Sequence, residues 1–272
     1  MSLNQQELRD AIRHLVHTPS DVLVCKYMKA CTAVRHVLPD KTIRFSPFEE
    51  MNDPRETEAQ FDCASFIDNS PPKDYFGLQE SFRCKFRNQA SAFCVTRDEY
   101  SNVDQDLMMR RGFGKMRMWA QYGDNHNGAC LVFQRDLLES AAVAALGRDR
   151  LWCDDIDYNR KMLVAGASAF TIEHEEFRRS PDEYLLHHSR RFQHHLFFRK
   201  HDDWIAEKEW RMATIASDGG GLCIRYADSL KYVILGHQVP DEAIFNVKQL
   251  FDGPILRLRY SQWKEDSVLN IT

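Results

Sequence analysis

Residues 209–226, EWRMATIASDGGGLCIRY, contain the pattern that decides the fold class. Glu209–Ile215 and residues 222–226 both carry the apolar, β-branched and aromatic side chains that are typical of strands. The cluster DGGG at 218–221 between them is typical of a tight turn. This pattern predicts a β-hairpin in the last third of the chain.

Outward from this hairpin, strand and helix patterns are mixed without a regular alternation. Leu8, Ile12 and Leu15 recur at helical spacing, which predicts an amphipathic helix over residues 4–17. We expect further strands at 22–27, 42–45, 92–96, 129–133, 151–158, 232–235 and 255–259, and helices at 31–38, 115–122, 136–146 and 161–200.

The irregular order favours an α+β fold with a mixed or antiparallel sheet. We predict a single domain over 1–272, with an N-terminal helix within 1–20 and a helical insertion at 161–200, broken near Ser180-Pro181.

The composition is that of a globular protein, with 43% hydrophobic and 28% charged residues among 272. It excludes collagen-like, low-complexity and disordered chains. Apolar runs such as 141–146 fall far short of the roughly 20 residues that span a bilayer. The polar beginning MSLNQQELRD lacks a signal-type apolar stretch. We therefore expect a cytoplasmic protein with no membrane partner.

The formal net charge of −4 excludes a strongly basic protein that coats nucleic acid. The eight cysteines include no Cys-x-x-Cys pair, so they do not predict a zinc site. We expect reduced, buried thiols and no metal cofactor.

Residues 187–201, HHSRRFQHHLFFRKH, combine five histidines and four Arg/Lys without an acid. The recurring histidine pairs are seven residues apart, about 10.5 Å along a helix, which is too far for one ion. Leu185, Phe192 and Leu196 predict a helix that packs on the core and exposes a basic face. That face is a nucleic-acid candidate, or else merely a solvated surface, and its cations are Arg190, Arg191, Arg199 and Lys200.

The segment Glu207-Lys-Glu-Trp-Arg211 concentrates charge at the beginning of a predicted strand. If it is extended from Glu207 onward, Glu207, Glu209 and Arg211 share one face. Two carboxylates and a guanidinium are costly to bury without partners. They indicate either a functional site or a row of ion pairs that faces solvent.

A second candidate segment is 118–128, MWAQYGDNHNG. Trp119 and Tyr122 lie three apart on one helical face, and His126 follows in a turn. They could line a pocket or simply anchor the helix on the core. We expect them to support a pocket rather than to carry a proton.

Together these segments resemble a widespread bacterial family known only as a domain of unknown function, number 2971. The resemblance follows the chain in order over nearly its whole length, and its most specific elements are Asn-Asp-Pro, Trp-x-x-Tyr and Glu-x-Glu-Trp-Arg. It rests on residues 25–27, 43–47, 51–54, 93–96, 118–128, 204–211 and 232–236. The family implies no settled activity.

The opening strand–helix–strand more distantly resembles the NAD-binding core of ADP-ribosyltransferases. The resemblance implies NAD as substrate, with Glu209 and Glu207 as catalytic residues. It implies cofactor-binding roles for Lys26, Tyr27, Ser46, Asn52, Asp53 and Arg211. Lys26 stands where the family has His or Arg, Pro47 follows Ser46 where the family has a second hydroxyl, and a long insertion precedes Glu209.

The activity implied is cleavage of the nicotinamide–ribose bond and transfer of ADP-ribose to a macromolecule, nucleic acid or protein, in a defence or toxin role. A carboxylate suits that chemistry because the transition state resembles an oxocarbenium ion. Two other classes remain open: a non-catalytic module that binds nucleic acid or a ligand, and an unrelated hydrolase. Nothing in the sequence predicts an oligomeric state.

Overall fold

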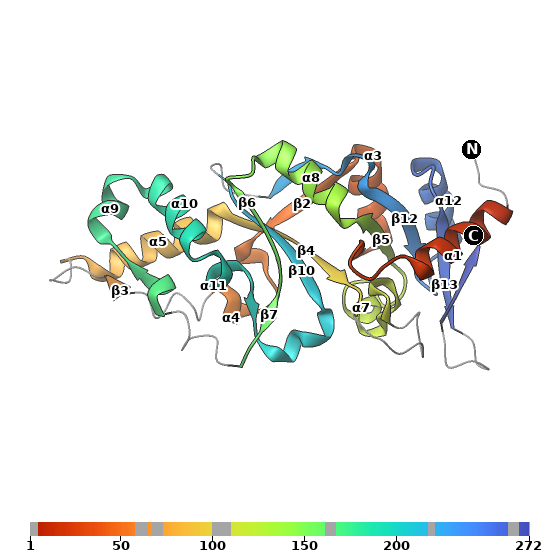
Figure 1. The fold of residues 1–272 in the computed structure, drawn as a ribbon, viewed down its shortest axis with the longest axis horizontal. Helices are drawn as coiled ribbons and strands as arrows, with labels where there is room; N and C mark the ends of the chain where they lie inside the picture. Colours follow the sequence, from red (N-terminus) through yellow and green to blue (C-terminus); the bar gives the residue numbers. More distant parts are fainter. Residues whose placement is uncertain are drawn as a thin grey trace.

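The computed structural model describes residues 5–57, 65–66, 73–99, 110–160, 167–216, 221–260 and 267–271. The molecule is elongated, with a sheet through its middle (Figure 1). Three helices lie at one end, α5 (Tyr75–Gln89), α9 (His174–Arg179) and α10 (Pro181–Arg191). At the other end lie α1 (Gln5–His17) and α12 (Asp241–Leu250).

The main sheet has the strand order β11-β2-β4-β1-β5-β12-β13-β14, and β10 pairs with both β4 and β6. All these pairs are antiparallel except β12 with β13, which confirms a mixed sheet in an α+β arrangement. The strands are β1 (Leu23–Met28), β2 (Thr42–Pro47), β4 (Ala90–Arg97), β5 (Ala129–Gln134), β6 (Leu151–Asp155), β10 (Glu209–Ile215), β11 (Leu222–Arg225), β12 (Leu230–Leu235), β13 (Ile255–Tyr260) and β14 (Ser267–Ile271).

Strand β4 is the centre of the arrangement because its two edges are used differently. One edge pairs with β10 along almost its whole length, from Thr96 to Ala90. The other edge is shared: β2 pairs with it at Ser91 and Ala92, and β1 pairs with it at Thr96 and Arg97. Strands β1 and β2 therefore separate along β4 and leave a gap beside residues 93–95.

Most of the remaining elements are short. The helices are α2 (Ala30–Thr32), α3 (Leu38–Asp40), α4 (Pro54–Thr57), α7 (Met116–Gln121), α8 (Arg135–Leu146), α11 (Gln193–Phe197), the π-helix η1 (Ala33–Val37), and the 3-10 helices η2 (Phe48–Glu50), η4 (Gly112–Gly114), η5 (Ala167–Phe170), η6 (Asp202–Glu207) and η7 (Ala227–Ser229). Two small sheets pair β3 (Ser65–Phe66) with β8 (Thr171–Ile172) and β7 (Asp157–Tyr158) with β9 (Arg199–Lys200). Among the described helices, none is both long and apolar enough to cross a membrane.

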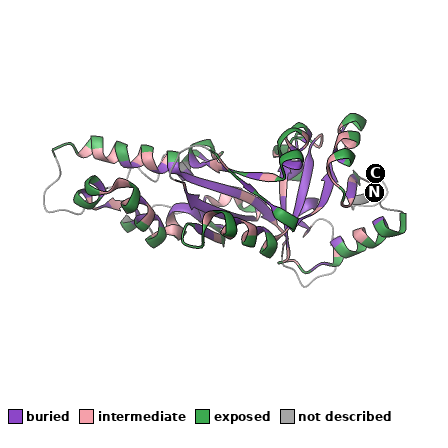
Figure 2. Ribbon diagram, turned by 90° about the horizontal axis from the view of Figure 1, so that it is seen from above, coloured by how far each residue is buried: buried purple, intermediate pink, exposed green. Residues whose placement is uncertain are grey.

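Helices cover the sheet and leave the strands buried between them (Figure 2). An aromatic cluster fills the space between β4, β6 and the helices α5 and α11. At its centre the Phe197 ring stacks on Trp152 at 5.2 Å and on Phe86 at 5.6 Å, and it meets the Phe48 ring edge-on at 5.5 Å. This cluster contacts Arg211 of β10, because the Arg211 guanidinium lies over the Phe48 ring and donates to the Phe197 carbonyl.

Outside 161–200, the predicted strands and helices lie at their expected places with bounds that differ by a few residues, and the strand predicted at 151–158 is divided into β6 and β7. The segment 161–200 is only partly helical: β8 and β9 lie within it, and residues 161–166 are outside the described residues. Helix α10 begins at Pro181, which confirms the break near Ser180-Pro181, since proline suits the first turn of a helix. Helices α5 and α12 were not predicted. The apolar periodicity of α5 is weak, whereas that of α12 is comparable to that of α10 and was overlooked. Phe82 and Phe86 of α5 and Val247 of α12 are buried.

The predicted hairpin is wrong. Strands β10 and β11 do not pair with each other: β10 lies between β4 and β6, and β11 pairs with β2. Residues 217–220 of the expected turn lie outside the described residues. All seven residues of β10 are buried, so both of its edges and both of its faces are occupied by distant segments, which a local turn signal does not reveal.

The condition under which Glu207 would share a strand face with Glu209 and Arg211 is not met, because β10 begins at Glu209. Helix η6 ends at Glu207, and Lys208 has a left-handed backbone with φ of 48°. Glu207 still reaches the same site as Glu209 and Arg211, as described below, but it does so from the end of a 3-10 helix.

The basic outer face predicted for residues 187–201 is wrong as well. Helix α10 ends at Arg191, and α11 ends at Phe197. Arg199 and Lys200 then enter β9, where only 4% and 5% of their surfaces are exposed. Because β9 pairs with β7, this segment lies inside the protein and not on its surface. Of the four predicted cations, only Arg190 and Arg191 are exposed.

The expectation that the cysteines are buried holds for Cys25 and Cys130 but not for Cys31, Cys84 and Cys223, which are exposed. All the cysteines within the described residues are free thiols, as expected. Cys63 lies outside the described residues.

The aromatic cluster predicts a large effect of one substitution. Phe197→Ala should lower the free energy of unfolding by about 3–5 kcal/mol, because the vacated volume is surrounded by rings that cannot all move inward. Phe76→Ala is the matched control, since the Phe76 side chain is 80% exposed. It should change the free energy of unfolding by less than about 0.5 kcal/mol. Urea unfolding followed by circular dichroism measures both, and equal effects would contradict this account of the core.

Candidate functional site

The candidate site is a cavity of about 170 Å³ at the gap where β1 and β2 separate along β4. Its wall is built by residues from β1, β2, β4, β10, α7 and the segment that follows β2. The structure brings together most of the predicted site residues in this wall, namely Lys26, Tyr27, Ser46, Asn52, Tyr122, Glu207, Glu209 and Arg211. Lys200 and Glu56 also line it.

Five charged side chains form one buried ion cluster at this wall: Glu56, Lys200, Glu207, Glu209 and Arg211. The Lys200 Nζ lies 2.7 Å from Glu207 Oε2, 3.2 Å from Glu209 Oε2 and 3.5 Å from Glu56 Oε1. The Arg211 guanidinium donates from Nε to Glu209 Oε1 at 2.6 Å and from Nη1 to Glu56 Oε2 at 2.7 Å. No member of the cluster is more than 5% exposed.

The ion cluster keeps Glu209 and Lys200 charged. Burial alone would raise the pKa of Glu209, but Arg211 and Lys200 outweigh it and lower that pKa to about 2. Burial likewise acts to lower the pKa of Lys200, and the attraction of Glu209, Glu56 and Glu207 more than reverses the effect. Glu209 is therefore a carboxylate throughout the physiological pH range. It supplies a fixed negative charge and has no proton to donate as a general acid.

Tyr122 connects helix α7 to the ion cluster. Its hydroxyl donates to Glu207 Oε1 at 2.6 Å and accepts from Asn52 Nδ2 at 3.2 Å. Burial and the Glu207 carboxylate raise the pKa of Tyr122, so it remains a phenol. These bonds connect Asn52, Tyr122 and Glu207 in the cavity wall. Asp53 is buried but does not line the cavity.

Trp119 and His126 lie outside the cavity wall. The Trp119 ring meets Tyr27 edge-on at 5.0 Å, and its Nε1 donates to Phe113 O at 2.8 Å. The His126 ring stacks on the Trp119 ring with 6.2 Å between their centroids, and His126 Nδ1 lies 3.1 Å from the Tyr260 hydroxyl. Trp119 thus supports Tyr27, which itself lines the cavity, and His126 supports Trp119.

Strand β4 contributes a thiol and a carbonyl to the gap. The carbonyl oxygen of Cys94 accepts a 2.9 Å hydrogen bond from Lys26 Nζ. Burial, followed by the charge of Glu209, raises the pKa of the Cys94 thiol to about 12. This thiol stays protonated at neutral pH, which makes it a poor nucleophile.

The sequence analysis missed two members of the ion cluster. Lys200 was assigned to an outer face because its neighbours along the chain are basic. Glu56 has no signal of its own, although it follows the Asn52-Asp53-Pro54 turn by two residues and lies in the first turn of α4. The proximity of Glu56 to that turn was the one available indication.

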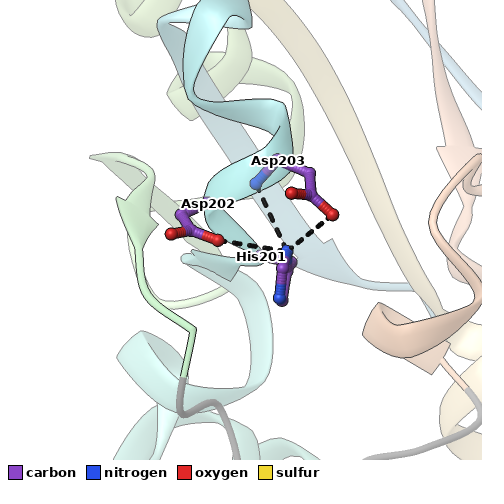
Figure 3. A group of neighbouring side chains, drawn as sticks. All are labelled: His201, Asp202 and Asp203. Carbon is purple, nitrogen blue, oxygen red and sulfur yellow. Dashed lines mark hydrogen bonds and ion pairs between the residues drawn. The ribbon is translucent and has the colours of Figure 1, made fainter.

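A second group of potential metal ligands lies at the beginning of η6 (Figure 3). The carboxylates of Asp202 and Asp203 approach His201 Nδ1 at 3.3 and 3.1 Å. The same Nδ1 accepts the backbone N–H of Asp203 at 3.2 Å and so caps the helix. Asp202 also binds Arg160. Capping and an ion pair explain this group, so it gives no support to a metal site.

Comparison with known proteins gives one match. Residues 118–212 match the model of a family described as a protein of unknown function (DUF2971). The match includes Tyr122, Lys200, Glu207, Glu209 and Arg211 but excludes β1 and β2, so the resemblance extends over a shorter part of the chain than we expected. No curated protein and no solved structure matches the chain.

The ion cluster predicts a strong effect of removing its central cation. Lys200→Met leaves three buried carboxylates with Arg211 alone, and it should lower the free energy of unfolding at pH 7 by about 3–5 kcal/mol. Arg160→Met is the control, because the Arg160 side chain is 81% exposed in its pair with Asp202. It should cost less than about 1 kcal/mol.

The same variant should show a distinctive pH dependence. The folded-state pKa of Glu209 is depressed from 4.5 to about 2, so its ion pairs contribute stability above pH 4.5 that is lost as the pH falls toward 2. In Lys200→Met the carboxylates protonate more readily, so the deficit relative to wild type should shrink as the pH falls from 7 to about 4. Urea titrations across this range measure the deficit, and one that grows on acidification would contradict the cluster.

Proposed function

We propose that this protein cleaves the nicotinamide–ribose bond of NAD and passes ADP-ribose to an acceptor or to water. One observation carries the proposal: Tyr27 from β1, Ser46 from β2 and Glu209 from β10 line the same cavity. These are the residues that the resemblance to ADP-ribosyltransferases selects, and they lie far apart in the chain. Their convergence at the gap beside β4 supports the proposal.

The electrostatics of the cavity suit this reaction. Loss of nicotinamide leaves positive charge on the ribose ring, and a fixed carboxylate stabilises that charge more in the transition state than in the ground state. Glu209 remains ionised because its pKa is about 2. The bonds from Lys200 and Arg211 hold it in one orientation, and the Cys94 thiol is a third hydrogen-bond donor to the same carboxylate. Of the roughly four lone-pair sites of a carboxylate, one is then left for a ribose hydroxyl.

The size of the cavity limits which part of NAD it encloses. About 170 Å³ is below the roughly 300 Å³ of pockets that enclose drug-sized ligands. The cavity would therefore hold the nicotinamide end, with the rest of the dinucleotide outside. Glu207, fixed by Tyr122 and Lys200, would lie beside the reacting ribose and face the acceptor.

A hydrolase with a histidine base has less support. Within the described residues, the cavity wall contains no histidine. His126 stacks on Trp119 and does not line the cavity. Burial lowers the pKa of His126, and the nearby His237 lowers it further. A module that binds a ligand without turnover would use the same cavity, and the assay below separates it from the enzyme.

The decisive measurement is the release of free nicotinamide from NAD by the purified protein, followed by liquid chromatography. Glu209→Gln keeps the volume but removes the charge, so turnover should fall at least about a hundredfold, or about 2.7 kcal/mol in activation free energy. Because Glu209 is buried between two cations, this variant should also lose stability. Assays must therefore be made below its unfolding temperature.

Two further variants make this test specific. Tyr122→Phe removes the hydroxyl that orients Glu207 and should lower turnover by about tenfold, or 1.4 kcal/mol, with the fold retained. Glu49→Gln is the control, since Glu49 is an exposed carboxylate outside the cavity, and its turnover should equal that of wild type. Wild-type protein that releases no nicotinamide, or a folded Glu209→Gln with full turnover, would overturn the proposed function.

His126→Ala tests the supporting role of the histidine. Loss of the stacked ring should lower the free energy of unfolding by about 1 kcal/mol, within the usual range for partly buried contacts. Turnover should stay within about threefold of wild type, or 0.7 kcal/mol, because no proton passes through His126 in this reaction. A fully folded variant with a large loss of turnover would instead favour a hydrolase with His126 as base.

A further inference from the structure

Among the described residues, one nitrogen of the Arg211 guanidinium has no hydrogen-bond partner. The Arg211 side chain is only 1% exposed and lines the cavity. Nε donates to Glu209, and Nη1 donates to Glu56 and to the carbonyl of Phe197. Nη2 is buried and has no hydrogen-bond partner among the described residues. Because a buried donor without an acceptor is destabilising, this nitrogen requires an acceptor that the described chain does not provide.

Lys26 is a second donor that is not fully used. Its ammonium group has three N–H donors, of which one binds the carbonyl of Cys94. The group lies over the Phe93 ring, 5.0 Å from its centroid. Within the described part of the chain, no carboxylate forms an ion pair with Lys26. The Lys26 ammonium group lies in the cavity wall and contacts one carbonyl oxygen and one aromatic ring. Two of its N–H groups are therefore available to a ligand.

Both side chains line the same cavity, and both are related to Cys94 of β4. Cys94, whose carbonyl binds Lys26, is the register partner of Arg211. Arg97 N donates to the carbonyl of Lys208, which makes these two residues a hydrogen-bonded pair. Hydrogen-bonded and non-hydrogen-bonded pairs alternate along antiparallel strands. The Arg211–Cys94 pair, three positions further along β10, therefore has no backbone hydrogen bonds. In such pairs the side chains are close, about 4.5 Å between Cα atoms. The Cys94 carbonyl then points away from β10 and toward Lys26 in the gap, while the Arg211 side chain lies on the same face of the sheet as the Cys94 thiol.

The charges around this place favour a neutral acceptor. Lys26, Lys200 and Arg211 carry three positive charges, and Glu56, Glu207 and Glu209 carry three negative charges. Glu50, the remaining carboxylate of the wall, is engaged by Arg44. A phosphate or carboxylate from a ligand would add negative charge beside three carboxylates. A carbonyl oxygen would satisfy the free donors without that repulsion.

We propose that Lys26 and Arg211 form a carbonyl-binding subsite, which holds the carboxamide oxygen of nicotinamide. This assignment rests on the proposed function and deepens it, because it names the group by which the substrate's base is recognised. The subsite places the base against Cys94 in the gap of β4. Discrimination between nicotinamide and rings without a carbonyl then depends on these two side chains.

A series of three small ligands tests the subsite on the unmodified protein. Calorimetric titration should show that nicotinamide binds at least about tenfold more tightly than 3-methylpyridine, which lacks the oxygen, or 1.4 kcal/mol. Nicotinate should bind more weakly than nicotinamide, because its carboxylate faces Glu56, Glu207 and Glu209. Equal affinity for nicotinamide and 3-methylpyridine, or tighter binding of nicotinate, would overturn the subsite.

A variant assigns the preference to Lys26. Lys26→Met keeps the length of the side chain and removes its donors, so the preference for nicotinamide over 3-methylpyridine should fall below about threefold, or 0.7 kcal/mol. Lys29→Met is the matched control: Lys29 is exposed, lies three residues along the chain and does not line the cavity. It should keep the full preference. An unchanged preference in folded Lys26→Met would overturn the assignment, and the wild-type series stands even if that variant does not fold.

These titrations and the cleavage assay fail independently. A protein that prefers nicotinamide but releases none from NAD has the subsite without the proposed reaction. A protein that cleaves NAD but binds nicotinamide and 3-methylpyridine equally has the reaction without the subsite.

Discussion

The buried pairing of Lys200 and Arg211 with three carboxylates is the interaction on which the rest of the site depends. These charges come from α4, β9, η6 and β10, and each is almost fully removed from water. Such charges are tolerable only when each has its partners at close range, so the cluster fixes four chain segments relative to one another. The aromatic cluster around Phe197 lies against it, and the Phe197 carbonyl itself accepts from Arg211.

The gap along β4 turns this ion cluster into the wall of a cavity. Strands β1 and β2 pair with successive parts of one edge of β4. If they met end to end, their backbones would cover the polar backbone groups of residues 93–95. Because the strands separate, the Cys94 carbonyl accepts a hydrogen bond from Lys26, and the buried ion cluster forms part of the cavity wall. A fixed negative charge, a satisfied phenol at Tyr122 and spare donors on Lys26 and Arg211 then face one small volume. That combination suits a neutral base joined to a sugar on which positive charge develops.

The order of the strands and helices could be predicted largely from local patterns, because the apolar spacing of segments such as 129–133 reflects the face that they bury. The residues of the Glu-x-Glu-Trp-Arg segment could also be selected, since two carboxylates and a guanidinium beside a strand are costly to bury without partners. The hairpin at 209–226 and the basic face at 187–201 were wrong for a common reason. In both cases a pattern of neighbouring residues was used to predict which segments lie side by side, and that depends on residues far away in the chain.

The sequence by itself determined several chemical groups of the site, among them Glu207, Glu209 and Arg211, and the approximate bounds of most of the elements that carry them. Only the tertiary structure decided that β10 lies between β4 and β6, that Lys200 turns inward, and that Glu56 completes the ion cluster. The physical reason is the range of the forces involved. Helical and strand periodicity is set by neighbours along the chain, whereas strand pairing and the desolvation of charges are set by segments more than a hundred residues apart, as Arg211 and Glu56 are.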